Sequence, residues 1–313
     1  MAKVESSIEG IIENLPISDG GGVVNIKVMG VTIHFVPGTT ASGRLKTIKT
    51  PTQRLTVNQF LDNTPFAGRT EAGFTGATVI AEGTYDTTTN ILEADFLDVQ
   101  PAEMVLLGAL TTATAGPPVN LAINGCPIVM LTDSRLSSNP SSPLSPLYLN
   151  QYGFVMKIAS ATTADNEIDQ PPPPSSAEGY YGGGQFHAFR FEYGGTGQFD
   201  QPQISIKAAT FIADDGENDL KVRGFVATGI PGMNPNIRIF QVTNDAAGNE
   251  VETEILPDKP IKFHNSEPSV VRWDFRARNI ALPAVGLPEF IRAKCVSGAV
   301  TLTATIDPKL REK

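Results

Sequence analysis

One stretch occurs twice in the chain, and this repeat constrains the fold more than any other feature. Val24–Val36 (VNIKVMGVTIHFV) aligns without a gap with Val119–Leu131 (VNLAINGCPIVML). In both, apolar residues alternate along two arms that are separated by Met29-Gly30 or by Asn124-Gly125. Alternation of period two predicts strands with one buried face, and Asn-Gly is a strong signal for a two-residue hairpin turn. Each stretch is therefore predicted to form a β-hairpin.

The repeat extends beyond the hairpins, because three flanking pairs of blocks match in the same order. Four matched blocks at a spacing of about 95 residues indicate two tandem copies of one small domain. The flanking pairs are Ile8–Ile12 with Leu107–Leu110, Ala81–Asp86 with Ala177–Gly182, and Leu92–Val99 with Phe186–Tyr193.

The composition favours an all-β chain of several small domains. Apolar residues make up 41% of the 313 residues, enough for buried cores, and the 29 glycines and 24 prolines indicate many turns. No apolar run approaches the roughly 18 residues of a membrane-spanning helix, so no membrane span is expected. Each copy is predicted to contain a glycine-bearing strand, the hairpin, a variable connection and two further strands, with a short helix at Thr56–Leu61 in the first copy. That order is typical of a five-stranded OB-type barrel.

The motifs of the repeat resemble those of a known group of domains. They run from the glycine-bearing first strand through the hairpin to Ala81–Asp86 (AEGTYD) and the alternating Leu92–Val99. This pattern is similar to that of uncharacterised OB-like domains found singly or in tandem in bacterial exported proteins. The resemblance covers about the first 195 residues and implies the OB-like fold. It supplies no catalytic residues that could be carried over to this chain.

The second copy departs from this pattern at an insertion, and a different domain follows it. Residues 162–176 contain a proline run, which lacks N–H donors and stays extended, so a protruding loop is predicted. After Gly194–Gly197, short alternating strands with one central tryptophan favour an immunoglobulin-like sandwich. The predicted domains are OB-like barrel 1 (1–101), OB-like barrel 2 with the proline-rich insertion (102–197) and the sandwich (198–313).

Charge, cysteine content and the N-terminus bear on partners and location. The net charge of −9 and the absence of a dense basic run argue against nucleic acid, which binds through its phosphates. Cys126 and Cys295 are predicted to be two separate buried thiols. The start, MAKVESSIEG, lacks the apolar segment of a secretory signal. The protein could stay inside the cell, have lost a signal or use another export route, and its composition favours an extracellular or cell-surface location.

The sequence offers little candidate chemistry. His34, His187 and His264 fall on separate predicted elements, two of them at similar strand positions of the two copies, so no shared metal or catalytic site is expected. Asp214–Asp219 (DDGEND) carries oxygen ligands that suit calcium, but it lacks the EF-hand spacing, and a solvated acidic turn is the favoured interpretation. No catalytic motif is present. We therefore expect no enzyme activity, no metal and no cofactor.

Aromatic residues at the end of the second copy provide a candidate ligand face. Tyr180 and Tyr181 are predicted to be its most exposed members, and OB-type sheets bind sugars and single strands on exposed aromatic rings. The simpler interpretation is that the neighbouring Phe189, Phe191 and Tyr193 share one strand face and fill the barrel.

Two functional hypotheses follow. The preferred one is a non-catalytic structural protein that forms homo-oligomers by β-rich contacts, such as a filament or lattice subunit, because β-modules have edges that must be paired or covered. The alternative is a module that binds carbohydrate or single-stranded nucleic acid through an OB-like face, with the acidity counting against nucleic acid. The expected assembly contact is the extended loop segment Asp169, Gln170, Pro171, Pro172, Pro173, Pro174, Ser175 and Ser176.

Overall fold

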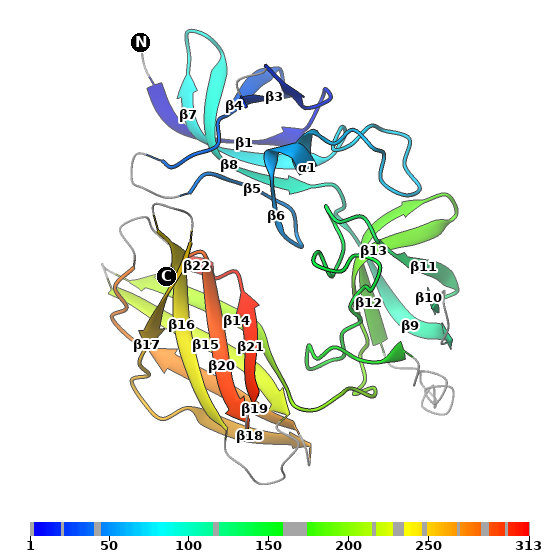
Figure 1. The fold of residues 1–313 in the computed structure, drawn as a ribbon, viewed down its shortest axis with the longest axis vertical. Coiled ribbons are helices and arrows are strands. Elements are labelled where there is room, and N and C mark those ends of the chain that lie inside the picture. The colour runs from blue at the N-terminus through cyan, green and yellow to red at the C-terminus, as the bar shows by residue number, and fades with distance from the viewer. Residues whose placement is uncertain are drawn as a thin grey trace. The chain divides into compact units, whose positions relative to one another are not determined.

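The computed structural model describes residues 3–19, 22–40, 45–114, 119–158, 174–214, 217–227, 235–245, 249–267, 270–282, 288–297 and 300–312. Strands dominate these residues, which confirms the predicted all-β class (Figure 1). The chain divides into two compact units. The barrel unit comprises Met1–Ala41, Leu45–Tyr148 and Ile158–Gly195, and the sandwich unit comprises chiefly Leu149–Lys157 and Thr196–Lys313.

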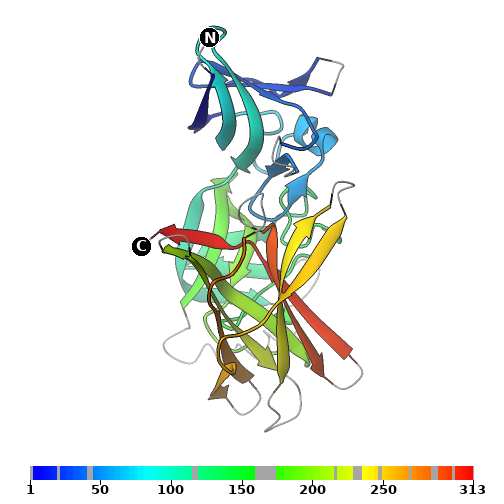
Figure 2. The same cartoon turned by 90° about the vertical axis from the view of Figure 1, so that its left-hand side faces the viewer.

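The first copy of the repeat forms one sheet in the barrel unit. Its elements are β1 (Lys3–Ile11), β2 (Ile17–Ser18), β3 (Val24–Val28), β4 (Val31–Phe35), β5 (Thr47–Lys49), β6 (Arg54–Leu55), α1 (Val57–Leu61), β7 (Thr78–Asp86) and β8 (Ile91–Gln100). β1 pairs with β7, β7 with β8, β8 runs parallel to β4, and β4 pairs with β3. β1 meets β3 at the Ile12–Val28 bridge. Figure 2 shows β7 and β8 as a long curved pair. The short strands β2, β5 and β6 make this an eight-stranded sheet, where five strands were predicted.

The second copy closes into a five-stranded barrel with an equivalent strand order. Its strands are β9 (Met104–Thr114), β10 (Asn120–Ile123), β11 (Cys126–Met130), β12 (Pro174–Gly182) and β13 (Gln185–Glu192). The order around the barrel is β10-β11-β13-β12-β9, and β11 and β13 are parallel, as β4 and β8 are in the first copy. The two repeated hairpins, β3–β4 and β10–β11, therefore occupy equivalent places in the strand order of both copies.

Two kinds of glycine explain why the flanking blocks repeat. The hairpin turns place Met29 and Asn124 at positive φ, 51° and 50°, as a type I′ turn requires. A Cβ on the strand glycine Gly10 or Gly108 would collide with the side chain of that turn residue. A second pair, Gly83 and Gly179, follows a β-bulge at the Ala-Glu-Gly motif, where a Cβ would collide with a carbonyl oxygen of the neighbouring strand.

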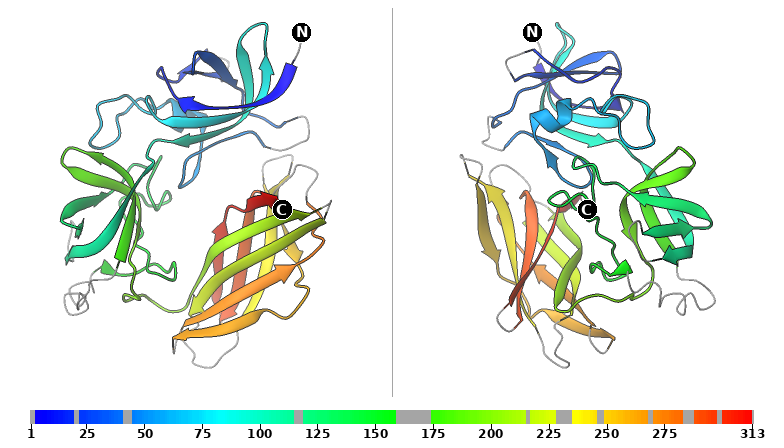
Figure 3. Two further views of the ribbon diagram at one scale, coloured as in Figure 1. Left: turned by 180° about the vertical axis from the view of Figure 1, so that it is seen from behind. Right: turned by 45° about the vertical axis from the view of Figure 1, so that its right-hand side comes forward.

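The sandwich unit contains two sheets packed face to face (Figure 3, left). Their orders are β18-β19-β15-β14-β22 and β17-β16-β20-β21. Apart from the additional strand β22, which runs parallel to β14, these orders match the A-B-E-D and C′-C-F-G sheets of immunoglobulin-like domains. Trp273 lies between them, fully buried, over Gly224 of the paired strand. The strands are β14 (Gln203–Asp214), β15 (Glu217–Ala227), β16 (Asn236–Asn244), β17 (Glu250–Ile255), β18 (Lys262–Glu267), β19 (Val270–Ala277), β20 (Phe290–Ser297), β21 (Val300–Ile306) and β22 (Lys309–Glu312).

The long β11–β12 connection corrects the predicted domain boundary. Leu149–Lys157 belongs to the sandwich unit, although the sequence places it within barrel 2. Tyr152 packs on Phe225 with ring centroids 5.0 Å apart, and Phe154 packs on Phe199 at the same distance. These aromatic contacts make the segment a cover for one end of the sandwich sheet.

The proline-rich insertion is also partly corrected. Of the predicted contact, residues 169–173 lie outside the described residues, as does most of the insertion 162–176. Pro174, Ser175 and Ser176 are not loop residues, because they begin β12 and pair with Ala109, Gly108 and Leu107 of β9. Proline is tolerated at the first residue of a strand, where its missing N–H removes no ladder bond.

Candidate functional site

Residues from both copies of the repeat form one continuous apolar core in the barrel unit. We call the part of this core where the two copies meet the seam. Leu131, Leu136, Tyr180 and Phe189 of the second copy join the buried core of the first. On the first copy the seam is lined by the connection between α1 and β7, which contributes Phe66 and Phe74 among others. Thr56 fixes the start of α1, the helix before this connection, because its side chain and that of Gln59 form a capping box at the N-terminus of α1.

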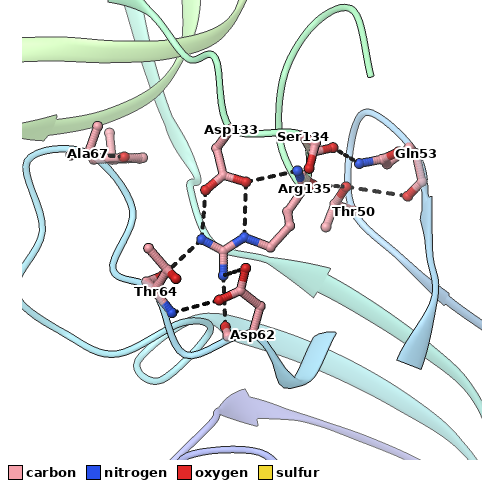
Figure 4. A network of polar contacts seen from close by, with 9 residues as sticks. Thr50, Gln53, Asp62, Thr64, Ala67, Asp133, Ser134 and Arg135 are labelled. Atoms are coloured by element: carbon pink, nitrogen blue, oxygen red, sulfur yellow. Dashed lines mark hydrogen bonds and ion pairs between the residues drawn. The ribbon is translucent and has the colours of Figure 1, made fainter. Parts of the chain in front are cut away.

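Arg135 is the central polar residue of the seam, and it is only 2% exposed (Figure 4). Its Nε and Nη2 donate to the two carboxylate oxygens of Asp133 at 2.9 and 2.6 Å. Its Nη1 and Nη2 also donate to the carbonyl oxygens of Asp62 and Thr64, respectively, both at 2.8 Å. A guanidinium buried this deeply requires such partners, since an unpaired buried charge is strongly unfavourable. Arg135 therefore fastens the second barrel to the α1–β7 connection of the first.

Aromatic rings and backbone contacts reinforce this attachment. The guanidinium carbon of Arg135 lies 4.2 Å from the ring centroid of Phe66 and 5.6 Å from that of Phe74. The carbonyl oxygen of Arg135 accepts a 3.1 Å hydrogen bond from the hydroxyl of Thr50, and that of Ser134 accepts one from Gln53. Asp133-Ser134-Arg135 thus contacts two separate segments of the first copy.

A second cluster of the seam contains Tyr180, which corrects the predicted ligand face. Tyr180 is 2% exposed, and its hydroxyl donates to the carbonyl of Ala67 at 2.6 Å. The guanidinium carbon of Arg69 lies 4.2 Å from the ring centroid of Tyr180, and the ring of His187 stacks on the same ring with the centroids 5.2 Å apart. Burial raises the pKa of the Tyr180 hydroxyl to about 12. The sequence could not show that the first copy covers this ring; Tyr181, by contrast, is 57% exposed as predicted.

The bulged residue of the last strand explains how the two copies differ at the seam. At the bulge in β8 the extra residue is Asp95, which forms a 2.7 Å ion pair with Lys46. At the matching bulge in β13 it is Phe189, which is buried in the seam. Phe191 and Tyr193 are buried as predicted, but the bulge separates Phe189 from them, so the three do not all fill one barrel.

The three histidines lie apart, and two of them are not at equivalent positions. His34 is on β4, the second arm of the repeated hairpin, whereas His187 is on β13, the last strand of its copy. His34 faces Glu93 and His264 faces Asp274, at 3.4 and 3.5 Å. Across the described ranges no group of three or more His, Cys, Asp or Glu residues is placed to hold a metal ion. Within Asp214–Asp219, residues 215 and 216 fall outside those ranges.

Comparisons with known proteins provide no family assignment: neither models of protein families nor curated proteins match this chain.

Both cysteines are free thiols, and burial raises the pKa of Cys295. Cys126 is only half-buried, where a buried thiol was predicted.

His187 makes the seam sensitive to acid. Its ring is 2% exposed, its Nε2 lies 3.1 Å from the carbonyl oxygen of Gly182, and its Nδ1 has no partner within the described residues. Burial lowers the pKa of His187, the charge of Arg69 lowers it further, and the Gly182 carbonyl opposes them. Because an unfolded histidine takes up its proton near pH 6.5, the native state is expected to lose stability as the pH falls below that value.

This pH dependence is measurable by urea unfolding of the barrel unit at pH 7.5 and pH 5. We expect the wild type to lose more stability over this interval than His187→Gln, which has no group to titrate at this position. The exposed His264 provides the control, and His264→Gln is expected to retain the wild-type loss. An equal loss in wild type and His187→Gln would contradict the lowered pKa, because it would show that His187 has the same pKa in the folded and the unfolded state.

Proposed function

We propose that this chain is a non-catalytic structural protein whose modules associate with further copies of the chain. The seam carries this proposal, because Tyr180, one of the two aromatic residues through which the second OB-like barrel would bind a ligand, is instead packed against the first barrel. Because this face of the second barrel packs against the first barrel, we infer that the two barrels form one rigid building block. It counts against the alternative of carbohydrate or single-stranded nucleic acid bound on Tyr180.

Other observations are consistent with a structural role. The described histidines are dispersed and lie beside Glu93, Asp274 and the carbonyl oxygen of Gly182. The helix α1 has five residues, and no described helix is long and apolar enough to cross a membrane. A location at the cell exterior belongs to the same proposal and rests on the composition alone.

Exposed apolar residues on the second barrel provide a surface for association. On β9, Met104, Val105 and Leu107 are 54%, 57% and 66% exposed. Exposed apolar side chains that cluster on one element are typical of contact sites between proteins. We assign this cluster, the β9 surface, to the contact with another copy.

Met29 on the first barrel is a candidate for the opposite half of that contact. It is 70% exposed and occupies a turn position with φ 51°, a conformation that disfavours methionine. The equivalent Asn124 suits the conformation, and its side chain bonds to the backbone of Leu107 and Ala109. Methionine thus occupies a turn position where asparagine would fit better. A contact between two different surfaces extends into a filament unless the rotation between successive copies closes it into a ring.

Variants of the two surfaces test the proposal by light scattering over a range of concentrations. We expect the wild type to increase in mass with concentration, and Leu107→Lys and Met29→Asn to remain monomeric. Met29→Asn should also unfold at slightly higher urea concentration, because asparagine tolerates the turn conformation. Leu144, 86% exposed, provides the control, and Leu144→Lys should associate like the wild type. A wild type that stays monomeric at every concentration would contradict the proposal.

A further inference from the structure

The outer face of one sandwich sheet concentrates positive charge in an otherwise acidic molecule. The inward side chains of β15 and β19, such as Val222 and Trp273, lie in the core of the sandwich. The residues that alternate with them point to solvent, because successive side chains of a strand face opposite ways. We call the exposed basic residues of this sheet the basic face: Lys221 and Arg223 on β15, Lys262 on β18, and Arg272 and Arg276 on β19.

Strand pairing brings these side chains together from distant parts of the sequence. Lys221 lies directly opposite Arg276, and Arg223 and Lys262 lie opposite Asp274 on its two sides. On the other side of Lys221 lies Thr210 of β14, and opposite Thr210 lies Lys309 of β22. Lys309 therefore belongs to the same row of side chains across the sheet. Neighbouring strands are about 4.8 Å apart and alternate residues about 7 Å apart, so the charges form a compact lattice. No single strand carries a run of basic residues, which explains why the sequence showed no basic cluster.

Few carboxylates neutralise this lattice. Asp274 lies within it and pairs with Arg272 at 3.1 Å, and Asp219 lies at the end of β15. Lys221, Arg223, Lys262 and Arg276 have no ion-pair partner among the residues that the structure describes. Like charges directly opposite each other on paired strands are destabilising, so the pair Lys221–Arg276 reduces the stability of the sheet.

The other sheet of the same sandwich shows that this is not a general property of the domain. There Arg238 lies opposite Lys294, but Arg238 pairs with Glu254 and Lys294 with Glu252. Arg292 pairs with both Glu250 and Glu252, at 2.8 and 2.6 Å. These contacts, first that of Lys294 and then that of Arg292, lower the pKa of Glu252. One outer face is thus charge-paired and the other is not.

We propose that the basic face binds an acidic polysaccharide, that is, a polymer with carboxylate or sulfate groups at regular intervals. The regular array of cations complements a regular array of anions. Single-stranded nucleic acid is less suited to it, because base stacking needs exposed aromatic rings. The aromatic residue of this face, Phe225, is covered by Tyr152. The inference does not depend on self-association, since the basic face belongs to the sandwich and the proposed assembly contacts belong to the barrels.

The chain offers a matched pair of variants for the test, because Lys221–Arg276 and Arg238–Lys294 are both cross-strand basic pairs. Native affinity electrophoresis would measure binding of wild type, Lys221→Gln/Arg276→Gln and Arg238→Gln/Lys294→Gln. The probes are polygalacturonate, dextran sulfate, uncharged dextran and a short single-stranded DNA. Circular dichroism checks that each variant is folded, and removal of the repulsive pair is not expected to impair folding.

We expect the wild type to bind both acidic polysaccharides, to ignore uncharged dextran, and to bind more weakly as salt is raised. Loss of Lys221 and Arg276 should weaken binding at least tenfold, whereas loss of Arg238 and Lys294 should change it less than twofold. The proposal is overturned if neither acidic polysaccharide binds, or if the two double variants lose affinity equally. Tighter binding to DNA than to either polysaccharide would likewise overturn it.

Discussion

Replacement of Arg135 by methionine is expected to lower the free energy of unfolding of the barrel unit by about 3–5 kcal/mol, the usual effect of removing one partner from a buried ion pair. The substitution leaves Asp133 without its bidentate partner and the carbonyl oxygens of Asp62 and Thr64 without donors. Methionine retains much of the apolar contact with Phe66 and Phe74. The loss of unfolding free energy therefore comes mainly from the missing hydrogen bonds and ion pair, and less from a cavity.

Urea unfolding followed by two signals measures this effect. The single tryptophan, Trp273, lies in the sandwich unit, so its fluorescence follows that unit, while circular dichroism follows both. We expect only the barrel transition to move. Arg238→Met, in an exposed ion pair, serves as the control and should leave the barrel transition unchanged. A barrel transition unchanged in Arg135→Met would show that the seam does not depend on Arg135.

The second large effect is expected for Gly68→Ala, in the connection that covers the second barrel. Gly68 has φ +74°, and a Cβ at this position would lie closer than 3.0 Å to Nε2 of His187. The left-handed backbone conformation disfavours alanine by about 1–2 kcal/mol, and overpacking against the buried ring adds about 1–3 kcal/mol. The barrel unit should lose the sum of these contributions in urea unfolding.

Gly76 separates the two contributions. It lies in the same connection at φ +79°, and no atom lies within 4 Å of a Cβ built on it. Gly76→Ala should therefore show the backbone contribution alone. Equal losses in the two variants would mean that Gly68 does not pack against His187, and would contradict the described seam.

The local elements of this fold could be predicted from the sequence, because local patterns determine them. The hairpins at Val24–Val36 and Val119–Leu131, the short helix after Thr56 and most sandwich strands have alternation, caps or turn residues in their own sequences. The equivalence of the two copies was also predictable, since Gly83 and Gly179 repeat for the same steric reason.

The contacts between distant segments could not be predicted in this way. Tyr180 has the sequence context of an exposed platform residue, and only the fold shows the connection at Ala67 lying over it. Arg135 follows a strand in a polar stretch, and nothing in that stretch indicates burial. The basic face is a similar case, because Lys221 and Arg276 become neighbours only through strand pairing.

We propose that copies of this chain associate through the β9 surface of the barrel unit. Electron cryomicroscopy of the purified protein at high concentration tests it most directly. We predict ordered assemblies in which a neighbouring copy lies against Leu107 and the Met29 turn of one chain contacts another. Particles that contain a single chain, or assemblies in which Leu107 and Met29 both face solvent, would contradict this mode of association.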